Sequence, residues 1–282
     1  MRTRFAPTPS GYLHEGNAVN AVLTAWLAQQ VGADLALRID DIDAARCRRE
    51  FVDDIFGVLS WLGVHWSLGP RTAADFDGQH SQRARIRHYR DELDAAVGAG
   101  LHVYACRCSR AEAARTGGRG CVSNCAVADY PLVTGESALR ARLPGAADDA
   151  VVWRRDGVPA YHLVSIVEDR DLGTTHIVRG VDLLDSTLLQ SALAPFFSMD
   201  FAGIDVRHHP LVLGSHAQKL SKSRLSAGPL DRSEATRQRV LGVARSMAAS
   251  VGIDEPGTPT VAASASDDAT DSVAGDALPL LD

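Results

Sequence analysis

Two short polar segments, far apart in the chain, have the residue types that bind phosphate groups. His14-Glu15-Gly16-Asn17 opens a predicted helix directly after a proline-rich loop, and the N–H groups at a helix N-terminus point at anions. His14 and Asn17 can donate hydrogen bonds to a triphosphate, and Gly16 leaves room for a nucleotide close to the backbone. Alone, this segment is also compatible with an ordinary helix start capped by Asn17.

The second segment, Lys219-Leu220-Ser221-Lys222-Ser223, places two lysines three residues apart in a loop. Ammonium groups at this spacing can bind the β- and γ-phosphates and stabilise the negative charge that moves onto departing pyrophosphate. A solvated basic loop would have the same composition. Because this lysine segment follows a predicted strand and accompanies the His14 segment, phosphate chemistry is the favoured interpretation.

Four of the five cysteines cluster as Cys106-x-Cys108 and Cys121-x₃-Cys125, in a segment rich in Gly, Arg and Ala. Four thiolates can hold one metal ion tetrahedrally and leave no open coordination position, which is typical of a structural site. In a reducing compartment, metal ligation is favoured over disulfides. An iron–sulfur cluster or four free thiols remain alternatives. Cys47 stands apart and is expected to be an ordinary helix residue.

Length and composition predict a globular protein outside the membrane. The chain has 282 residues, 45% of them hydrophobic, which is ample for a buried core. It has no run of 18 apolar residues and no apolar signal region at its start, so a cytoplasmic protein is expected. The net charge is -6, but residues 253–282 hold seven acids and no Lys or Arg. Without this acidic tail, which is expected to be disordered, the remainder carries +1 and could present a local basic face to RNA.

The order of predicted elements indicates an α/β fold. Residues 3–10 predict a short buried strand that runs into a proline-rich loop, Gly16–Gly32 a helix, Ala33–Ile39 a strand and Ala44–Leu62 a helix. This order predicts a Rossmann-like parallel sheet with crossover helices. Further on we expect helices at His80–Gly98, Ser186–Phe197 and Arg232–Ser250, strands at Leu101–Ala105, Thr175–Arg179 and His208–Leu213, and a β pair formed by Val151–Trp153 and Ala160–Val167. Residues 1–252 are expected to form one domain with a short helical C-terminal part, and an insertion at about 76–150 is expected to hold the cysteine cluster at 106–125.

In this order, the two phosphate-binding segments resemble the two signature motifs of class I aminoacyl-tRNA synthetases. The resemblance implies a catalytic domain that activates an amino acid with ATP and Mg²⁺. The catalytic residues that it implies are His14, Asn17, Lys219 and Lys222, and the residues that bind ATP are His14, Gly16, Asn17 and Lys222. Glu15 departs from the motif at a position whose side chain normally points away from ATP.

Residues 1–225 also resemble the glutamyl branch of this class, through the segments 4–11, 37–43, 153–163 and 175–184. About one helix and a tail follow the lysine segment, so no anticodon-binding domain is expected. In both respects the chain is similar to the glutamyl-queuosine tRNA(Asp) synthetase family. The resemblance implies transfer of glutamate to the queuosine base of tRNA(Asp), and a structural Zn²⁺ on the four cysteines; a monomer is expected.

The resemblance also assigns an amino-acid pocket by position. Arg4 and Arg179 are expected to bind carboxylate, because a guanidinium matches a carboxylate with two hydrogen bonds. A buried ion pair is the alternative for an arginine in a strand. Tyr161 is expected to hydrogen-bond the substrate, and Thr8 belongs to the same set.

Two further members of this pocket depart from the family's pattern. Asp40, which is expected to bind the substrate ammonium group, stands where the family usually has the longer Glu. Ser165 stands where glutamyl-tRNA synthetases often have Asn. A dicarboxylic amino acid is still expected, because both arginines are present.

The implied reaction needs little acid–base chemistry, since the substrate carboxylate attacks phosphorus and pyrophosphate leaves. Four histidines are therefore expected to be structural or surface residues, namely His162, His176, His208 and His209. Two other functions stay open. One is a ligase that passes an acyl-adenylate to a non-RNA acceptor, and the other is an inactive synthetase paralogue that binds tRNA or nucleotide.

Overall fold

The computed structural model of the protein describes residues 1–109, 111–112, 121, 123–143, 149–212 and 228–256. Its main sheet has four parallel strands in the order β2-β1-β6-β7. They are β1 (Arg2–Phe5), β2 (Asp34–Leu37), β6 (His176–Gly180) and β7 (Asp205–His209). From β1 the chain crosses to β2 on one side, while β6 lies on the other side. The carboxyl ends of β1 and β6 therefore form a topological switch point, where such sheets bind ligands.

Three helices pack around this sheet: α1 (Glu15–Val31), α2 (Arg49–Leu62) and α9 (Glu234–Ala248). Helix α1 is apolar on nearly all sides because it is covered by α2, α9 and the sheet, with Trp26 fully buried. Gly32 and Gly63 end α1 and α2 in the left-handed conformation, at φ 62° and 71°, which glycine adopts without a steric penalty.

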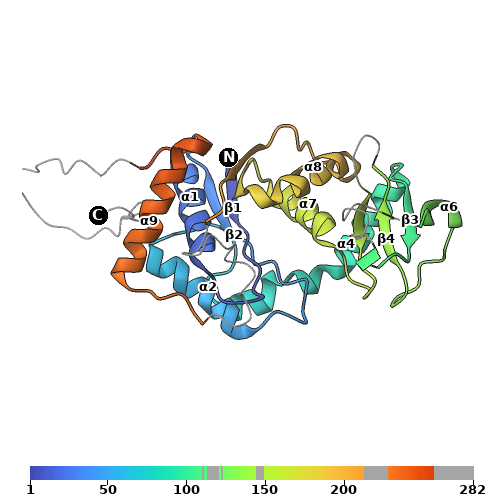
Figure 1. Ribbon diagram of the computed structural model, residues 1–282, viewed down its shortest axis with the longest axis horizontal. Helices are drawn as coiled ribbons and strands as arrows, with labels where there is room; N and C mark the ends of the chain where they lie inside the picture. Colours follow the sequence, from blue (N-terminus) through green and yellow to red (C-terminus); the bar gives the residue numbers. More distant parts are fainter. Residues whose placement is uncertain (110, 113–120, 122, 144–148, 213–227, 257–282) are drawn as a thin grey trace, which may run out of the picture.

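A second group of elements extends the molecule away from this end (Figure 1). An antiparallel sheet of β3 (Val103–Cys106), β4 (Ala138–Ala141) and β5 (Ala150–Trp153) lies at the far end with α6 (Cys125–Ala128). Helices α4 (Ile86–Gly98), α7 (Tyr161–Leu172) and α8 (Leu184–Leu193) connect it to the main sheet. A second hydrophobic core joins these helices to the small sheet.

The predicted α/β fold with its parallel sheet is confirmed, but one predicted element is wrong. Ala160–Val167 was expected to pair with Val151–Trp153, whereas the chain forms α7 from Tyr161 and β5 pairs with β4. Five successive residues from Leu163 to Val167 are buried. A helix that is buried on several sides lacks the polar positions that would show its period, so a short apolar run reads equally well as a strand.

Other boundaries differ by a few residues. The second helix begins at Arg49 rather than Ala44, so Cys47 lies in the turn before it and not on a helix. The strand expected at His208–Leu213 is β7, which ends at His209. Short elements also occur at α3 (Ala73–Asp75) and at residues 76–85, 181–183, 194–197 and 249–251. Nearly all of the acidic tail lies outside the described residues.

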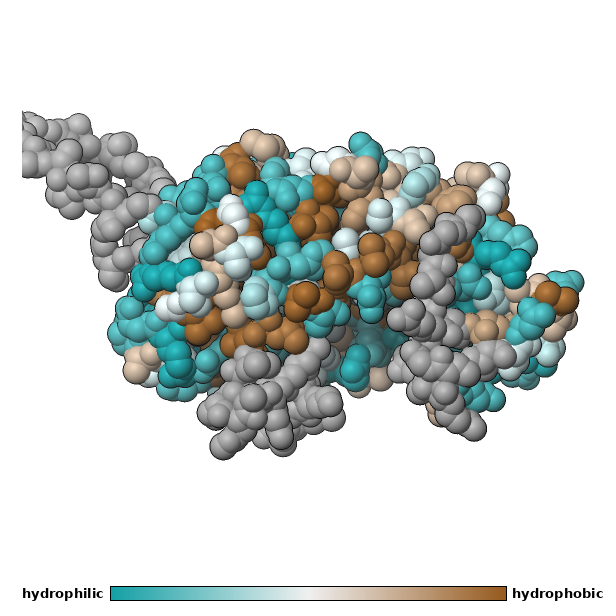
Figure 2. Space-filling view, turned by 45° about the horizontal axis from the view of Figure 1, so that its top comes forward, coloured by the Kyte–Doolittle hydropathy of each residue, from teal (hydrophilic) through white to brown (hydrophobic). Residues whose placement is uncertain are grey.

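The surface mixes both kinds of side chain (Figure 2). Hydrophobic residues gather along the middle of the face shown, and the end where α9 lies is more hydrophilic. Two leucines of α8, Leu184 and Leu188, are 45% and 64% exposed. Among the described residues, no helix is both long and apolar enough to cross a membrane.

Candidate active site

The His14 segment forms the tip of α1. His14 precedes the first helical residue, and its backbone N–H donates to Oδ1 of Asn17 at 3.2 Å, while the His14 side chain accepts from the backbone of Asn17 in a reciprocal cap. A Cβ atom at Gly16 would lie 2.9 Å from the His14 ring. Glycine at this position therefore keeps the imidazole at the helix tip, where the dipole attracts anions.

A cavity of about 350 Å³ lies at the switch point. Its lining includes the helix tip and most of the residues assigned to the amino-acid pocket: Arg4, Thr8, His14, Gly16, Asn17, Asp40, Tyr161 and Arg179. They come from β1, the loop after it, the start of α1, the segment after β2, the start of α7 and the end of β6. The fold thus brings residues from distant parts of the sequence to one switch-point cavity.

The floor of this cavity is a buried chain of charges. Asp169 on α7 accepts hydrogen bonds from Nε of Arg4 at 2.8 Å and from Nη1 of Arg38 at 2.9 Å. Arg38 in turn donates to Asp40 from Nε at 2.7 Å and from Nη2 at 3.0 Å. Burial alone would raise the pKa of Asp169, but the guanidinium groups of Arg4 and Arg38 hold it below its usual value.

Asp40 is therefore engaged from more than one side. Besides Arg38, its Oδ1 accepts from Nε2 of Gln82 at 2.8 Å. Arg4 is at the same time in a buried ion pair and part of the cavity lining. The sequence left an ion pair and a place in the pocket as alternatives for Arg4, and the structure has both.

Arg179 at the end of β6 is only 3% exposed. Its Nη1 donates to Oε1 of Gln190 at 2.8 Å, whereas its buried Nε has no hydrogen-bond partner among the described residues. Burial lowers the pKa of Arg179 and the neighbouring Arg4 adds to this effect, while Tyr161 and Asp169 oppose it. An anion bound in the cavity would satisfy the guanidinium and reverse the shift.

One predicted pocket residue is not found in this cavity, and two predicted catalytic residues fall outside the described chain. Ser165 is 1% exposed inside α7, is not part of the lining, and its Oγ has no hydrogen-bond partner among the described residues. Lys219 and Lys222 lie outside the described residues.

Asp169 and Gln82 support the cavity but were not predicted from the sequence. Both act through other residues, Asp169 through Arg4 and Arg38, and Gln82 through Asp40. Gln82 lies in a polar turn and Asp169 in the charged run Glu168-Asp169-Arg170-Asp171. No local pattern there shows which acid becomes buried or which partners it meets, so the sequence gives no signal for either residue.

The four histidines have mainly local contacts. His176 bonds to Oγ1 of Thr175, His208 to Oγ1 of Thr187, and His209 to the carbonyl of Pro210, at 2.8, 2.7 and 2.8 Å. Burial, together with Arg179, lowers the pKa of His162 to about 4, so this ring is neutral at neutral pH. These contacts agree with structural roles, although His209 also lines the cavity.

A second and larger groove, of about 1200 Å³, continues from the cavity. It shares Thr8, Asp40 and Tyr161 with the switch-point cavity and reaches Cys106 and Cys108. Four arginines line this arginine groove: Arg46, Arg140, Arg154 and Arg155. The groove therefore connects the site at the main sheet with the cysteine cluster.

The groove wall is fastened to the cysteine loop by Arg155. Its Nη2 donates to the carbonyl oxygens of Arg107 and Cys108, at 2.9 and 3.2 Å. Asp43 lies beside Arg46 and Arg154, Asp156 lies beside Arg154, and the two carboxylates offset part of the charge of these arginines.

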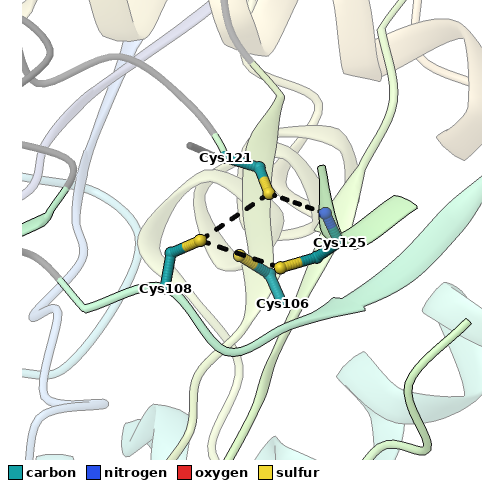
Figure 3. A group of neighbouring side chains, drawn as sticks. All are labelled: Cys106, Cys108, Cys121 and Cys125. Carbon is teal, nitrogen blue, oxygen red and sulfur yellow. Dashed lines mark hydrogen bonds between the residues drawn. The ribbon is translucent and has the colours of Figure 1, made fainter. Parts of the chain in front are cut away.

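The four predicted ligand sulfurs converge at the end of β3 (Figure 3). Sγ of Cys108 lies 3.7 Å from Sγ of Cys121 and 3.7 Å from Sγ of Cys125, and all four sulfurs lie within 4.8 Å of one another. A tetrahedral ion with sulfurs at about 2.3 Å would separate them by about 3.8 Å. The sulfurs are too far apart for disulfides and fit a single ion better than a multi-iron cluster, which needs space for bridging sulfides.

These geometries and the sequence agree with one family of proteins. The family model for the catalytic domain of class I tRNA synthetases (E and Q) matches residues 1–119 and 130–240. The chain therefore belongs to this family, and it is a ligase of the class I aminoacyl-tRNA synthetase type.

Individual relatives show which members of this family the chain is similar to. The chain is 37% identical to a glutamyl-Q tRNA(Asp) synthetase of Symbiobacterium thermophilum over 255 residues, covering 78% of this chain and 77% of the relative. It is 33% identical to glutamate–tRNA ligase 1 of Nitrosococcus oceani, covering 83% of this chain but only 53% of the relative. A crystal structure of a glutamate tRNA ligase from Elizabethkingia meningosepticum in complex with its amino acid has the same fold, with a TM-score of 0.60 at 21% identity, covering 82% of this chain and 54% of that one.

Proposed function

We propose that this protein activates glutamate with ATP and transfers it to the queuosine base of tRNA(Asp). The observation that carries the proposal is that one cavity joins a helix tip suited to phosphate with the buried guanidinium of Arg179, whose Nε has no partner among the described residues. Phosphates at the helix tip and a carboxylate at Arg179 would lie side by side, which is the arrangement that adenylate formation needs.

In this reaction the chain acts by positioning and charge. The α-carboxylate of glutamate attacks the α-phosphorus of ATP, the bond from that phosphorus to the bridging oxygen breaks, and pyrophosphate leaves. His14 and the dipole of α1 neutralise phosphate oxygens, and the two lysines stabilise the departing pyrophosphate. Arg179 binds a carboxylate of glutamate, and Arg4 lines the same cavity. No side chain has to take up a proton during the attack.

The preference for queuosine rests on the relatives and on the arginine groove. Two glutamyl-Q tRNA(Asp) synthetases match at 37% and 35% identity, and several glutamate–tRNA ligases match at 30–33%. The groove gives an acceptor nucleotide a path to the switch-point cavity, with guanidinium groups that can bind phosphate.

ATP–pyrophosphate exchange with each amino acid, with and without tRNA, tests the first step. Exchange with glutamate is expected, and no exchange with any amino acid would favour an inactive binding module. The acceptor is tested by incubating labelled glutamate with queuosine-containing tRNA(Asp) and with an unmodified transcript of the same tRNA. Label on the modified tRNA alone is expected. Equal labelling of both would indicate the 3′ end, and exchange without labelling of either would indicate a non-RNA acceptor.

We further propose that the four cysteines hold one structural Zn²⁺ and that residues 1–252 work as one catalytic domain, with the region at about 76–150 as an insertion. Four sulfur ligands leave no open position for catalysis, so the ion would staple the loop beneath the arginine groove. Arg155 would transmit this order to the groove through its bonds to the carbonyls of Arg107 and Cys108.

Replacing Cys108 with serine should remove the metal and loosen the groove. We expect less than one zinc per chain by metal analysis, a lower Tm, and weaker tRNA binding, because the Cys108 carbonyl that Arg155 binds is no longer held. ATP–pyrophosphate exchange with glutamate in the absence of tRNA should fall much less than transfer of glutamate to tRNA. Cys47→Ser, which removes a thiol outside the cluster, is the matched control and should keep the zinc. A parent protein purified without zinc or any other bound metal would contradict this proposal.

A further inference from the structure

Asp54 is a buried carboxylate outside the site described so far. It lies on α2, its side chain is 2% exposed, and it lines neither the switch-point cavity nor the arginine groove. Its Oδ2 accepts the backbone N–H of Leu13 at 2.9 Å, and its Oδ1 accepts Nη2 of Arg232 at 2.5 Å. One carboxylate thus joins two segments that are more than two hundred residues apart in the sequence.

These two segments flank the two signature motifs. Leu13 directly precedes His14 at the helix tip, and Arg232 follows Lys222 by ten residues. The backbone around Arg232 is itself fixed, because Ser233 caps α9 by accepting the backbone N–H of Thr236, and Asp231 accepts from Ser233. The chain that returns from the lysine segment is therefore anchored at this arginine.

Helix α2 leaves room for this arginine. A Cβ atom at Gly57 would lie 2.5 Å from Nη1 of Arg232. Glycine within a helix is unfavourable for the helix itself. The close approach of the guanidinium accounts for its presence here.

A second contact joins the same parts of the molecule at the surface. Arg239 on α9 donates to Oε1 of Glu15 from Nη2 at 2.5 Å. Glu15 is the residue that departs from the signature motif, and this ion pair gives it a partner on the C-terminal helix. An exposed pair of this kind contributes little free energy by itself, whereas the buried Asp54 holds both Arg232 and the backbone N–H of Leu13.

We propose that Asp54 and Arg232 are positioning residues for the adenylation reaction. Asp54 fixes the backbone immediately before His14 and, through Arg232, sets the chain that follows the lysine segment relative to the helix tip. This inference rests on the proposed function, because the two motifs must act on one triphosphate. Neither residue touches the cavity, so the effect is on geometry and not on substrate binding.

Gly57→Ala tests the idea without deleting either charge. The three atoms nearest to the added methyl group all belong to the flexible end of Arg232, so the substitution should displace this guanidinium from Asp54, while alanine favours the helix. We expect a modest drop in Tm, because the gain in helix propensity offsets only part of the cost of leaving the buried Asp54 without its guanidinium. The kcat for pyrophosphate exchange should fall on the order of tenfold, since small misplacements of reacting groups are costly. KM for glutamate should change less than about twofold, because its binding residues are untouched.

Two further variants decide between positioning and a general structural effect. Arg232→Gln should lower kcat to the same extent, and the double variant with Gly57→Ala should be no slower than either single one. Additive losses would show that Gly57 does not act through Arg232 and would overturn the proposal. Asp53→Asn, one residue away and 58% exposed on the same helix, is the matched control and should have the parent's kinetics.

A readout that needs no activity separates this inference from the proposed function. Hydrogen exchange of the Leu13 amide should be faster in Gly57→Ala than in the parent, because Asp54 is no longer held by Arg232. If the parent shows no pyrophosphate exchange but the Leu13 amide still exchanges hydrogen faster in Gly57→Ala than in the parent, the proposed function is refuted and the contact stands. If the parent carries out glutamate-dependent pyrophosphate exchange and Gly57→Ala has the same kcat, the positioning role is refuted and the proposed function stands.

Discussion

Arg179→Gln should raise KM for glutamate in pyrophosphate exchange by about 10²-fold or more. Hydrogen bonds to a charged group contribute about 1.5–3 kcal/mol each, and a bidentate arginine makes two of them. The same change should leave the folded state stable, because the wild-type guanidinium is buried with an unpartnered Nε and a lowered pKa. A glutamine there removes a buried charge that is only partly satisfied without substrate.

The measurement is exchange over a wide range of glutamate concentrations, with Tm recorded for each variant. Arg179→Lys should recover only part of the affinity, since it keeps the charge and loses the planar pair of donors. Arg207→Gln, on the neighbouring strand β7 and paired with Asp205, is a suitable control and should behave like the parent. An unchanged KM in Arg179→Gln would remove this arginine from the amino-acid pocket.

Lys222→Ala should lower kcat for exchange by about 10²- to 10³-fold, which is the loss expected when one donor to developing charge is removed. KM for glutamate should change little, because the lysine acts on pyrophosphate and not on the amino acid. A kcat close to the parent's would refute the assignment of the lysine segment.

The composition allows an independent check of this assignment. Lys219 and Lys222 are the only lysines in the sequence, while the chain has 27 arginines. An amine-reactive reagent can therefore modify only these two side chains and the N-terminus. Modification of the lysines should abolish pyrophosphate exchange. ATP with Mg²⁺ should protect against both the modification and the loss of activity. Labelling at either lysine that ATP does not slow would contradict a phosphate contact.

The sequence predicted those parts of the molecule that carry their own local pattern. The strand–helix–strand start and the helix tip at His14 were found because period, turn residues and capping residues agree there. The four cysteines were recognisable by spacing alone, and their sulfurs do converge.

Other features depend on contacts that no local pattern shows. Helix α7 was mistaken for a strand because burial on several sides hides its period. The chain from Gln82 through Asp40 and Arg38 to Asp169 joins three segments, and only the fold decides which acid meets which arginine. For the same reason, the sequence did not predict that Asp40, expected to bind the substrate ammonium group, is also held by Arg38 and Gln82.

The packing of α1 has a consequence for how the protein is made. Helix α1 leaves the ribosome among the first residues, yet Val240, Leu241, Ala244 and Ala248 of α9 belong to the core that covers it. Its apolar surface therefore remains uncovered until almost all of the described chain has been translated. During that interval an exposed Trp26 helix is a target for chaperones and a risk for aggregation, so truncation before α9 should give insoluble nascent chains rather than a smaller stable domain.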